Sequence, residues 1–183
     1  DSTVRDLVTE TLSKMSAECA HVRVETIDPV TQPQRIAALS GDAGSIENGT
    51  VFVTNPDATR IIRLSPEDFL FSRTVLGEEY TIYCGEAQLI GAIGRACTEN
   101  PVGVYFLTGH GELTQADCSL LALQLRSNGF EVHSGEIARI APAATDILLL
   151  LSPRSDLTGD EAQTLAAFLD NGGRVLVACG ADT

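Results

Sequence analysis

The C-terminal half of the sequence alternates short apolar runs with segments of helical pattern, and this alternation constrains the fold more than any other feature. Residues 147–151 are all aliphatic, and residues 102–108 and 175–178 are further, largely apolar runs. Strands that are apolar at nearly every position are typical of parallel sheets, because helices cover both faces of such sheets. We therefore expect an α/β domain built on a parallel sheet.

Capping signals place the helices of this domain. Thr114 with Asp117, and Thr158 with Glu161, match the capping box, in which side chains of the first helical turn satisfy free N–H groups. The second of these helices should bury the residues at helical spacing, which are Ala162, Leu165, Ala166 and Leu169. A strand is predicted over 130–137. Residues 138–145 are short for a parallel crossover, so either a tight helical turn follows or this strand pairs differently.

The first part of the chain has a different order of elements. It should contain a helix near the N-terminus, a strand over 21–27, a short helix beginning at Pro33, and a hairpin with strands 50–54 and 59–64. This α-β-α-β-β order is typical of a thioredoxin-like unit. We predict two domains: residues 1–78, a thioredoxin-like α/β unit, and residues 79–183, the parallel-sheet domain. The latter should open with a helix over 85–98, whose apolar face is Ile90, Ile93, Gly94 and Cys97.

Charge and cysteine spacing exclude several classes of function. The chain has 12 basic and 25 acidic residues, a formal charge of -13, which disfavours binding to nucleic acid or to anionic lipid. No segment reaches the roughly 20 apolar residues of a membrane helix. The five cysteines form no CxxC pair and none lies at metal-ligand spacing from histidine, so we predict no redox dithiol and no metal. We interpret the cysteines as small buried hydrophobic residues.

A glycine-flanked histidine follows the predicted strand 102–108. Ligands of open α/β sheets bind beyond the carboxyl ends of strands, and Gly109, His110, Gly111 and Glu112 occupy that position. The glycines let the backbone approach a ligand closely, and the next helix could hold an anion at its N-terminus. The other candidate ligand-binding residues, expected along the same edge, are Ser152, Arg154 and Gly180. No GxGxxG fingerprint is present, so no nucleotide cofactor is predicted.

The same loop admits a catalytic alternative. A hydrolase or amidotransferase-like enzyme would use His110 as the base and Glu112 as its partner or as a metal ligand. Such an enzyme also needs a nucleophile or further ligands, and the sequence has no GxSxG elbow, no HExxH motif and no cysteine at a strand-to-helix elbow. We therefore predict that the protein is not an enzyme. His110 then either contributes to ligand binding or only hydrogen-bonds its own loop.

Two stretches resemble a known family. Residues 86–93 and 104–112, the latter ending in Thr108-Gly109-His110-Gly111-Glu112, resemble the gliding-motility-type ABC transporter auxiliary family (GldG-like). Less specific matches are residues 27–29, 146–153 and 172–176, so the resemblance covers nearly the whole chain.

The resemblance implies a location and partners. Proteins of this family have an extracytoplasmic region flanked by membrane helices, and they act beside an ABC permease and its ATPase in gliding motility or export. Their second domain is flavodoxin-like or glutamine-amidotransferase-like and lacks the nucleophile of that enzyme. We expect a fragment without the membrane helices, with its C-terminal domain truncated. A homodimer through an exposed sheet edge is a further possibility.

Overall fold

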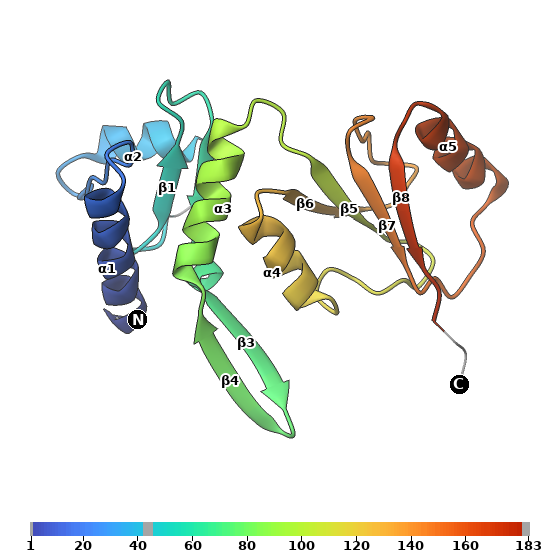
Figure 1. Ribbon diagram of the computed structural model, residues 1–183, viewed down its shortest axis with the longest axis horizontal. Coiled ribbons are helices and arrows are strands. Elements are labelled where there is room, and N and C mark those ends of the chain that lie inside the picture. Colours follow the sequence, from blue (N-terminus) through green and yellow to red (C-terminus); the bar gives the residue numbers. More distant parts are fainter. Residues whose placement is uncertain (1, 42–45, 181–183) are drawn as a thin grey trace. The chain divides into compact units, whose positions relative to one another are not determined.

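The chain consists of two compact units that divide after Cys97. The computed structural model describes residues 2–41 and 46–180 (Figure 1). The N-terminal unit contains α1 (Ser2–Glu18), α2 (Pro33–Ser40), β1 (Val51–Thr54), β2 (Ile61–Leu64), the 3₁₀ turn η1 (Pro66–Phe69), β3 (Leu70–Val75), β4 (Glu78–Tyr83) and α3 (Gly85–Cys97). The C-terminal unit contains β5 (Gly103–Leu107), α4 (Ser119–Ser127), β6 (Glu131–Gly135), β7 (Ile147–Leu151), α5 (Gly159–Asp170) and β8 (Arg174–Ala178).

The core of the N-terminal unit forms where α1 and α3 meet β2 and η1. Its buried members are Val4, Val8, Leu64, Phe69, Leu89 and Ala92. The predicted hairpin is confirmed, because β1 and β2 pair antiparallel with Val51 opposite Leu64. The predicted strand over 21–27 is wrong, since residues 22–28 have no regular structure. The α-β-α-β-β order therefore fails at its first strand, and the strands of this unit form two separate hairpins.

Helix α3 buries a different face from the one predicted. Leu89, Ala92 and Ala96 are buried, whereas Ile90 is 52% exposed and Cys97 is exposed. The helix packs on β1 and η1, and the small residues of the buried face allow that close approach. Helix α3 therefore belongs to the first unit. The predicted boundary after residue 78 falls instead inside the hairpin β3–β4, which the sequence did not reveal.

The predicted parallel sheet is confirmed in the C-terminal unit. Four parallel strands have the order β6-β5-β7-β8, and α4 and α5 lie on opposite faces (Figure 1). One core cluster joins Ala122 of α4 to Val104, Phe106 and Leu149, and a second joins Phe168 of α5 to Leu107, Leu148 and Leu150. The continuous apolar strands are thus covered on both sides.

The short connection between β6 and β7 passes over β5 without a helix. Ile137 is buried and Ile140 packs beside it in the core on the α5 side of the sheet. The carboxylate of Asp146, itself buried, accepts hydrogen bonds from the N–H groups of Gly103 and Ala143, both at 2.8 Å. The N–H groups of Arg139 and Ile140 both donate to the carbonyl of Glu136, so a tight turn with one helix-like hydrogen bond follows β6, as the first alternative expected. The carboxylate of Asp146 fixes the end of this connection to the start of β5, and the strand pairing stays parallel.

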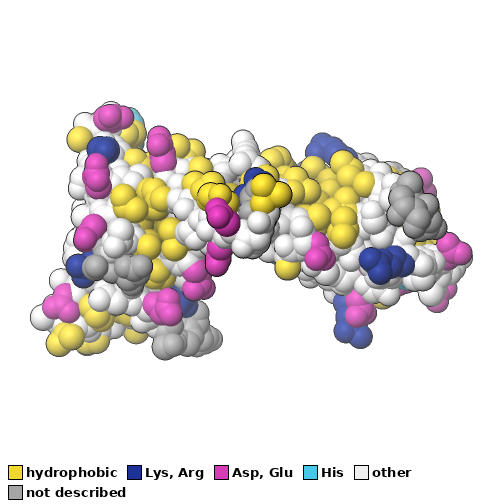
Figure 2. Space-filling model, turned by 90° about the horizontal axis from the view of Figure 1, so that it is seen from below, with side chains coloured by type: hydrophobic (Ala, Val, Ile, Leu, Met, Phe, Trp, Pro, Cys, Tyr) yellow, Lys and Arg dark blue, Asp and Glu magenta, His cyan; other side chains and the backbone are white. Residues whose placement is uncertain are grey.

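Parts of the C-terminal unit are less covered than predicted. On α5 only Leu165 and Phe168 pack against the sheet, while Ala162, Ala166 and Leu169 are exposed. Further exposed large apolar residues in the C-terminal unit are Leu113, Leu120, Leu121, Leu176 and Val177, and Figure 2 shows hydrophobic side chains on the surface of this unit. The prediction that the cysteines are buried is wrong for three of them, because Cys19 and Cys97 of the first unit and Cys179 of the second are exposed. None of the helices in the described residues is long and apolar enough to cross a membrane.

Candidate functional site

The strand order places a topological switch point at the carboxyl edge of the parallel sheet. Strand β5 connects to β6 on one side, whereas β7 connects to β8 on the other side. Ligands of open α/β sheets bind at such a switch point, beyond the carboxyl ends of the two central strands. The loop that begins at Thr108 follows β5, and the loop that begins at Ser152 follows β7. The candidate residues therefore flank the position where the fold favours a ligand.

Backbone hydrogen bonds join these two loops. The N–H of Arg154 donates to the carbonyl of His110 at 2.8 Å, and the N–H of Leu113 donates to the carbonyl of Leu151 at 2.8 Å. Gly111 has φ +74°, and a β-carbon there would lie 3.2 Å from Cβ of Arg154. A side chain at position 111 would therefore be strained and would also crowd the neighbouring loop.

The third part of the edge comes from the end of β8. The N–H of Ser152 donates to the carbonyl of Ala178 at 2.6 Å, and Ser152 itself has φ +50°. A β-carbon on Gly180 would lie 3.1 Å from Oγ of Ser152. The structure thus brings every candidate residue predicted from the sequence to the same edge. Ligand binding by these residues remains a prediction.

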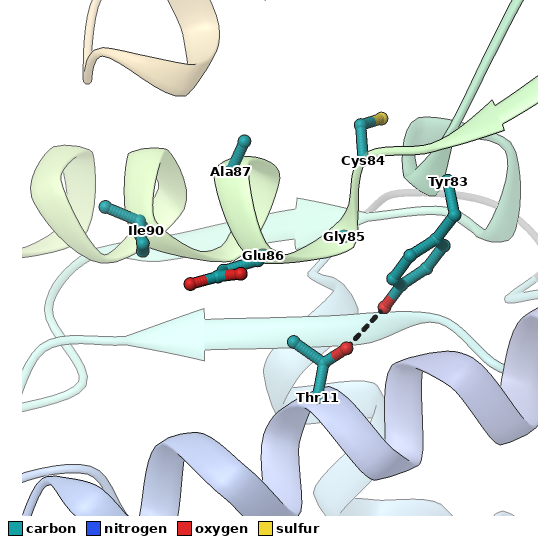
Figure 3. Close-up of a pocket in the computed structure, with 7 residues that line it drawn as sticks. All are labelled: Thr11, Tyr83, Cys84, Gly85, Glu86, Ala87 and Ile90. Carbon is teal, nitrogen blue, oxygen red and sulfur yellow. Dashed lines mark hydrogen bonds between the residues drawn. The ribbon is translucent and has the colours of Figure 1, made fainter.

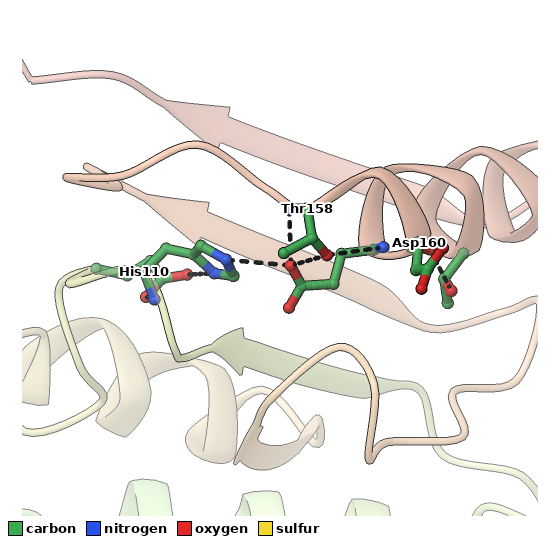
Figure 4. A network of polar contacts seen from close by, with 6 residues as sticks. His110, Thr158 and Asp160 are labelled. Atoms are coloured by element: carbon green, nitrogen blue, oxygen red, sulfur yellow. Dashed lines mark hydrogen bonds and ion pairs between the residues drawn. The ribbon is translucent and has the colours of Figure 1, made fainter.

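Carboxylates lie against both ring nitrogens of His110. Nδ1 is 3.4 Å from Oε1 of Glu112, and Nε2 is 3.2 Å from Oε2 of Glu161 (Figure 4). The side chains are largely buried, with exposed fractions of 11% for His110, 2% for Glu112 and 16% for Glu161. Oε2 of Glu112 also accepts the backbone N–H of His110 at 2.7 Å. The imidazole is therefore held between its own loop and the first turn of α5.

Glu161 is itself fixed by the N-cap of α5. Its Oε2 accepts the hydroxyl of Thr158 at 2.6 Å and the N–H of Thr158 at 2.9 Å. In return, the N–H of Glu161 donates to the Thr158 hydroxyl at 3.3 Å, which completes the predicted capping box. The hydroxyl and the N–H of Thr158, followed by His110, lower the pKa of Glu161. Each of these contacts favours the ionised carboxylate.

In this arrangement both ring nitrogens of His110 face carboxylates. A histidine base needs one ring nitrogen directed at the group it deprotonates, while the other nitrogen is oriented by a partner. Glu112 could act as that partner, but Glu161 lies where the nucleophile would be. Within residues 2–41 and 46–180, no three histidine, cysteine, aspartate or glutamate side chains are grouped to hold a metal ion.

Sequence reasoning missed two features of this edge. Glu161 was identified only as a helix cap, although its helix follows the strand that ends at the same edge as His110. This topological relation could have paired the two residues. Cys179 directly follows β8 and carries a free, exposed thiol beside Gly180. Whether this cysteine lies at a strand-to-helix elbow is not tested, because residues 181–183, which follow it, lie outside the described residues.

A concave feature lies in the N-terminal unit. It is an open groove of about 410 Å³ lined by Thr11, Tyr83, Cys84, Gly85, Glu86, Ala87 and Ile90 (Figure 3). The hydroxyls of Thr11 and Tyr83 hydrogen-bond at 2.8 Å, and the Tyr83 ring occupies the space where a side chain at Gly85 would lie. Burial raises the pKa of the Cys84 thiol, so this cysteine is not activated as a nucleophile.

The fold and the site together define a two-unit α/β protein in which two joined loops lie at the switch point of a four-stranded parallel sheet. No protein family, curated protein or solved structure matches this chain.

Proposed function

We propose that this chain is a non-catalytic accessory component of an ABC-type transport system, which acts outside the cytoplasm and binds a partner protein or an exported ligand. The observation that carries the non-catalytic part is the position of His110, whose two ring nitrogens face Glu112 and Glu161. A histidine in this position connects a loop to a helix. It fixes the loop after β5 to the first turn of α5, at the edge where a partner or ligand would bind.

The transport context comes from the resemblance of residues 86–93 and 104–112 to the gliding-motility-type auxiliary family. That resemblance supports an ABC permease and its ATPase as partners. We also propose a flavodoxin-like or glutamine-amidotransferase-like assignment for the C-terminal unit, which the order β6-β5-β7-β8 supports. A thioredoxin-like assignment is not proposed for the first unit, because its first expected strand is missing.

Cross-linking in the source cells tests the partners. An affinity tag on this chain should recover a permease and an ATPase of the ABC type, identified by mass spectrometry. Arg154→Glu reverses the charge of an exposed residue in the loop after β7, beside His110, and should reduce that recovery. Arg174→Glu makes the same change at the opposite end of the sheet, where β8 begins, and should not. Recovery of neither transporter subunit with the unaltered chain would contradict the proposal.

A substrate screen tests the non-catalytic part separately. The purified chain is incubated with ester, amide and glycoside substrates, beside a His110→Ala variant. We expect no turnover with either protein. Turnover that is present in the unaltered chain and lost in His110→Ala would establish the hydrolase alternative instead.

A further inference from the structure

The hairpin β3–β4 is largely exposed, and every described side chain from Ser72 to Ile82 in it is exposed. Its strands pair over six residues each, from Leu70 opposite Tyr83 to Val75 opposite Glu78. It is attached at its base, where Leu70 and Tyr83 pack against the core and the N–H of Cys84 donates to the carbonyl of Phe69 at 2.9 Å. Figure 1 shows the hairpin extending past the ends of α1 and α3. We call residues 70–83 the arm.

The two faces of the arm differ in chemistry. One face carries Phe71 opposite Ile82 and Arg73 opposite Tyr80. Ile82 is 54% exposed and Tyr80 is 49% exposed. On the other face the hydroxyls of Ser72 and Thr81 hydrogen-bond at 2.8 Å. A two-stranded hairpin is marginally stable unless an apolar face is covered. On the face that carries Phe71, Tyr80 and Ile82, the last two side chains are open to solvent.

The turn at the tip of the arm has a leucine where its turn type disfavours one. Leu76 and Gly77 have φ +54° and +84°, which is the pattern of a type I′ hairpin turn. Asparagine, aspartate or glycine is favoured at the first position, because other side chains are strained in the left-handed region. Leu76 is nonetheless there and is fully exposed. Its side chain adds nothing to the packing of this chain, so it is available as an anchor for another molecule.

Charge distinguishes between the molecules that could bind the arm, which are a second copy of this chain and a segment of another protein. The outer half of β4 begins with Glu78 and Glu79, and Arg73 is the one basic residue among residues 70–83. Two copies joined through this strand would bring like carboxylates together on chains of formal charge -13. A segment of another protein that combines apolar side chains with lysine or arginine would meet opposite charge and an apolar face together.

We propose that the arm is a docking surface for such a basic, apolar segment of a partner protein, with Leu76, Tyr80 and Ile82 as its anchoring side chains. Figure 2 views the molecule from below the tip of the arm and shows hydrophobic and acidic side chains there. This surface belongs to the unit that does not contain His110. The proposal is therefore independent of the loops around His110 and of the transport function.

Peptide binding tests the proposal. The probes are two fluorescein-labelled peptides, Lys-Val-Lys-Val-Thr-Val-Lys and its acidic counterpart Glu-Val-Glu-Val-Thr-Val-Glu, and the readout is fluorescence anisotropy with the whole chain. The basic peptide should bind and should bind more weakly as salt is raised, whereas the acidic peptide should not bind. Ile82→Thr should weaken binding about tenfold, as expected for loss of an anchoring side chain.

Leu76→Asn separates docking from folding without changing the charge of the arm. Asparagine suits the left-handed backbone of the turn better than leucine does, so this variant should be at least as stable while binding the basic peptide about tenfold more weakly. Leu176→Thr, at an exposed leucine of the other unit, should bind like the unaltered chain. Equal binding of both peptides, unchanged binding by the arm variants, or no binding of the basic peptide would overturn the proposal. So would a dimer in light scattering that Leu76→Asn dissociates, since the arm would then pair two copies.

Discussion

At the residue scale, the contact between His110 and Glu161 shows how a helix cap can also hold a loop. Glu161 satisfies the N-terminus of α5 through Thr158 and at the same time lies 3.2 Å from the ring of His110. The carboxylate therefore connects the secondary structure of one βα unit to the loop of another. Its neighbour Asp160 carries the same charge at the same helical turn without taking part in this contact (Figure 4).

Glu161 should make stability depend on pH in the acidic range. Its pKa is lowered in the folded protein, mainly by the hydroxyl and N–H of Thr158. When the pKa of a carboxyl group is lower in the folded than in the unfolded protein, its ionisation stabilises the fold. This contribution is fully present at pH values above the unfolded-state pKa, and it is lost as pH falls through the folded-state pKa. Glu161→Gln should flatten the acid side of the pH–stability curve, measured by urea denaturation. Asp160→Asn is the matched control and should leave the slope unchanged; equal slopes in all three proteins would contradict the assignment.

Asp146 should be among the most sensitive polar residues of the C-terminal unit. Its buried carboxylate accepts two N–H groups that hold the crossover between β6 and β7. Asp146→Ala leaves both donors without this partner, and we expect a loss of about 3 kcal/mol in the free energy of unfolding. Asp156→Ala, at an exposed position in the loop before α5, should change it by less than about 0.5 kcal/mol. Similar values for the two variants, from chemical denaturation, would refute this role.

At the element scale, the sequence predicted those elements whose local signals agree with their burial. Strands β5 and β7 are apolar and buried, and the box formed by Thr158 and Glu161 marks the start of α5. The residues 21–27 alternate like a strand but have no pairing partner, so the pattern did not determine the structure. The arm was missed for the opposite reason: charged and hydroxyl residues are frequent in it, and pairing rather than burial defines its strands.

The candidate site could likewise be predicted from the sequence only where a local pattern defines it. The loop around His110 could be placed, because a strand and a glycine-rich turn adjoin in sequence. The partner of its Nε2 could not be placed by local pattern, since Glu161 is more than fifty residues away and comes close only through the order of the parallel strands. The buried face of α3 was missed because hydropathy favoured Ile90, whereas packing against β1 and η1 buries Leu89, Ala92 and Ala96.

The turn at the tip of the arm provides a test of local strain. Leu76→Asn places a residue preferred in the left-handed region at φ +54° and should stabilise the chain by about 0.5–1 kcal/mol. Gly77→Ala makes the reverse change at φ +84° and should destabilise it by about 1 kcal/mol. Thermal denaturation followed by circular dichroism measures both. Stabilisation by neither change, or by both, would show that the turn is not of type I′ in solution.

At the scale of the whole molecule, each unit has its own buried core. Phe69 and Leu89 lie in the cluster of the first unit, whereas Phe106 and Phe168 lie in the two clusters of the second. No cluster draws members from both units within the described residues. Cooperative unfolding follows the continuity of a packed core, so the two units should behave as separate cooperative blocks.

Calorimetry should accordingly resolve two unfolding transitions. Leu89→Ala removes a side chain that is 1% exposed in the first core, and Leu148→Ala removes one that is 1% exposed in the second. Each substitution should cost about 2–5 kcal/mol, because it removes buried surface and leaves a cavity. Each should lower the temperature of one transition only, and the two should affect different transitions. A single transition that both substitutions shift equally would mean that the two cores unfold together, and the division after Cys97 would then describe geometry without describing folding.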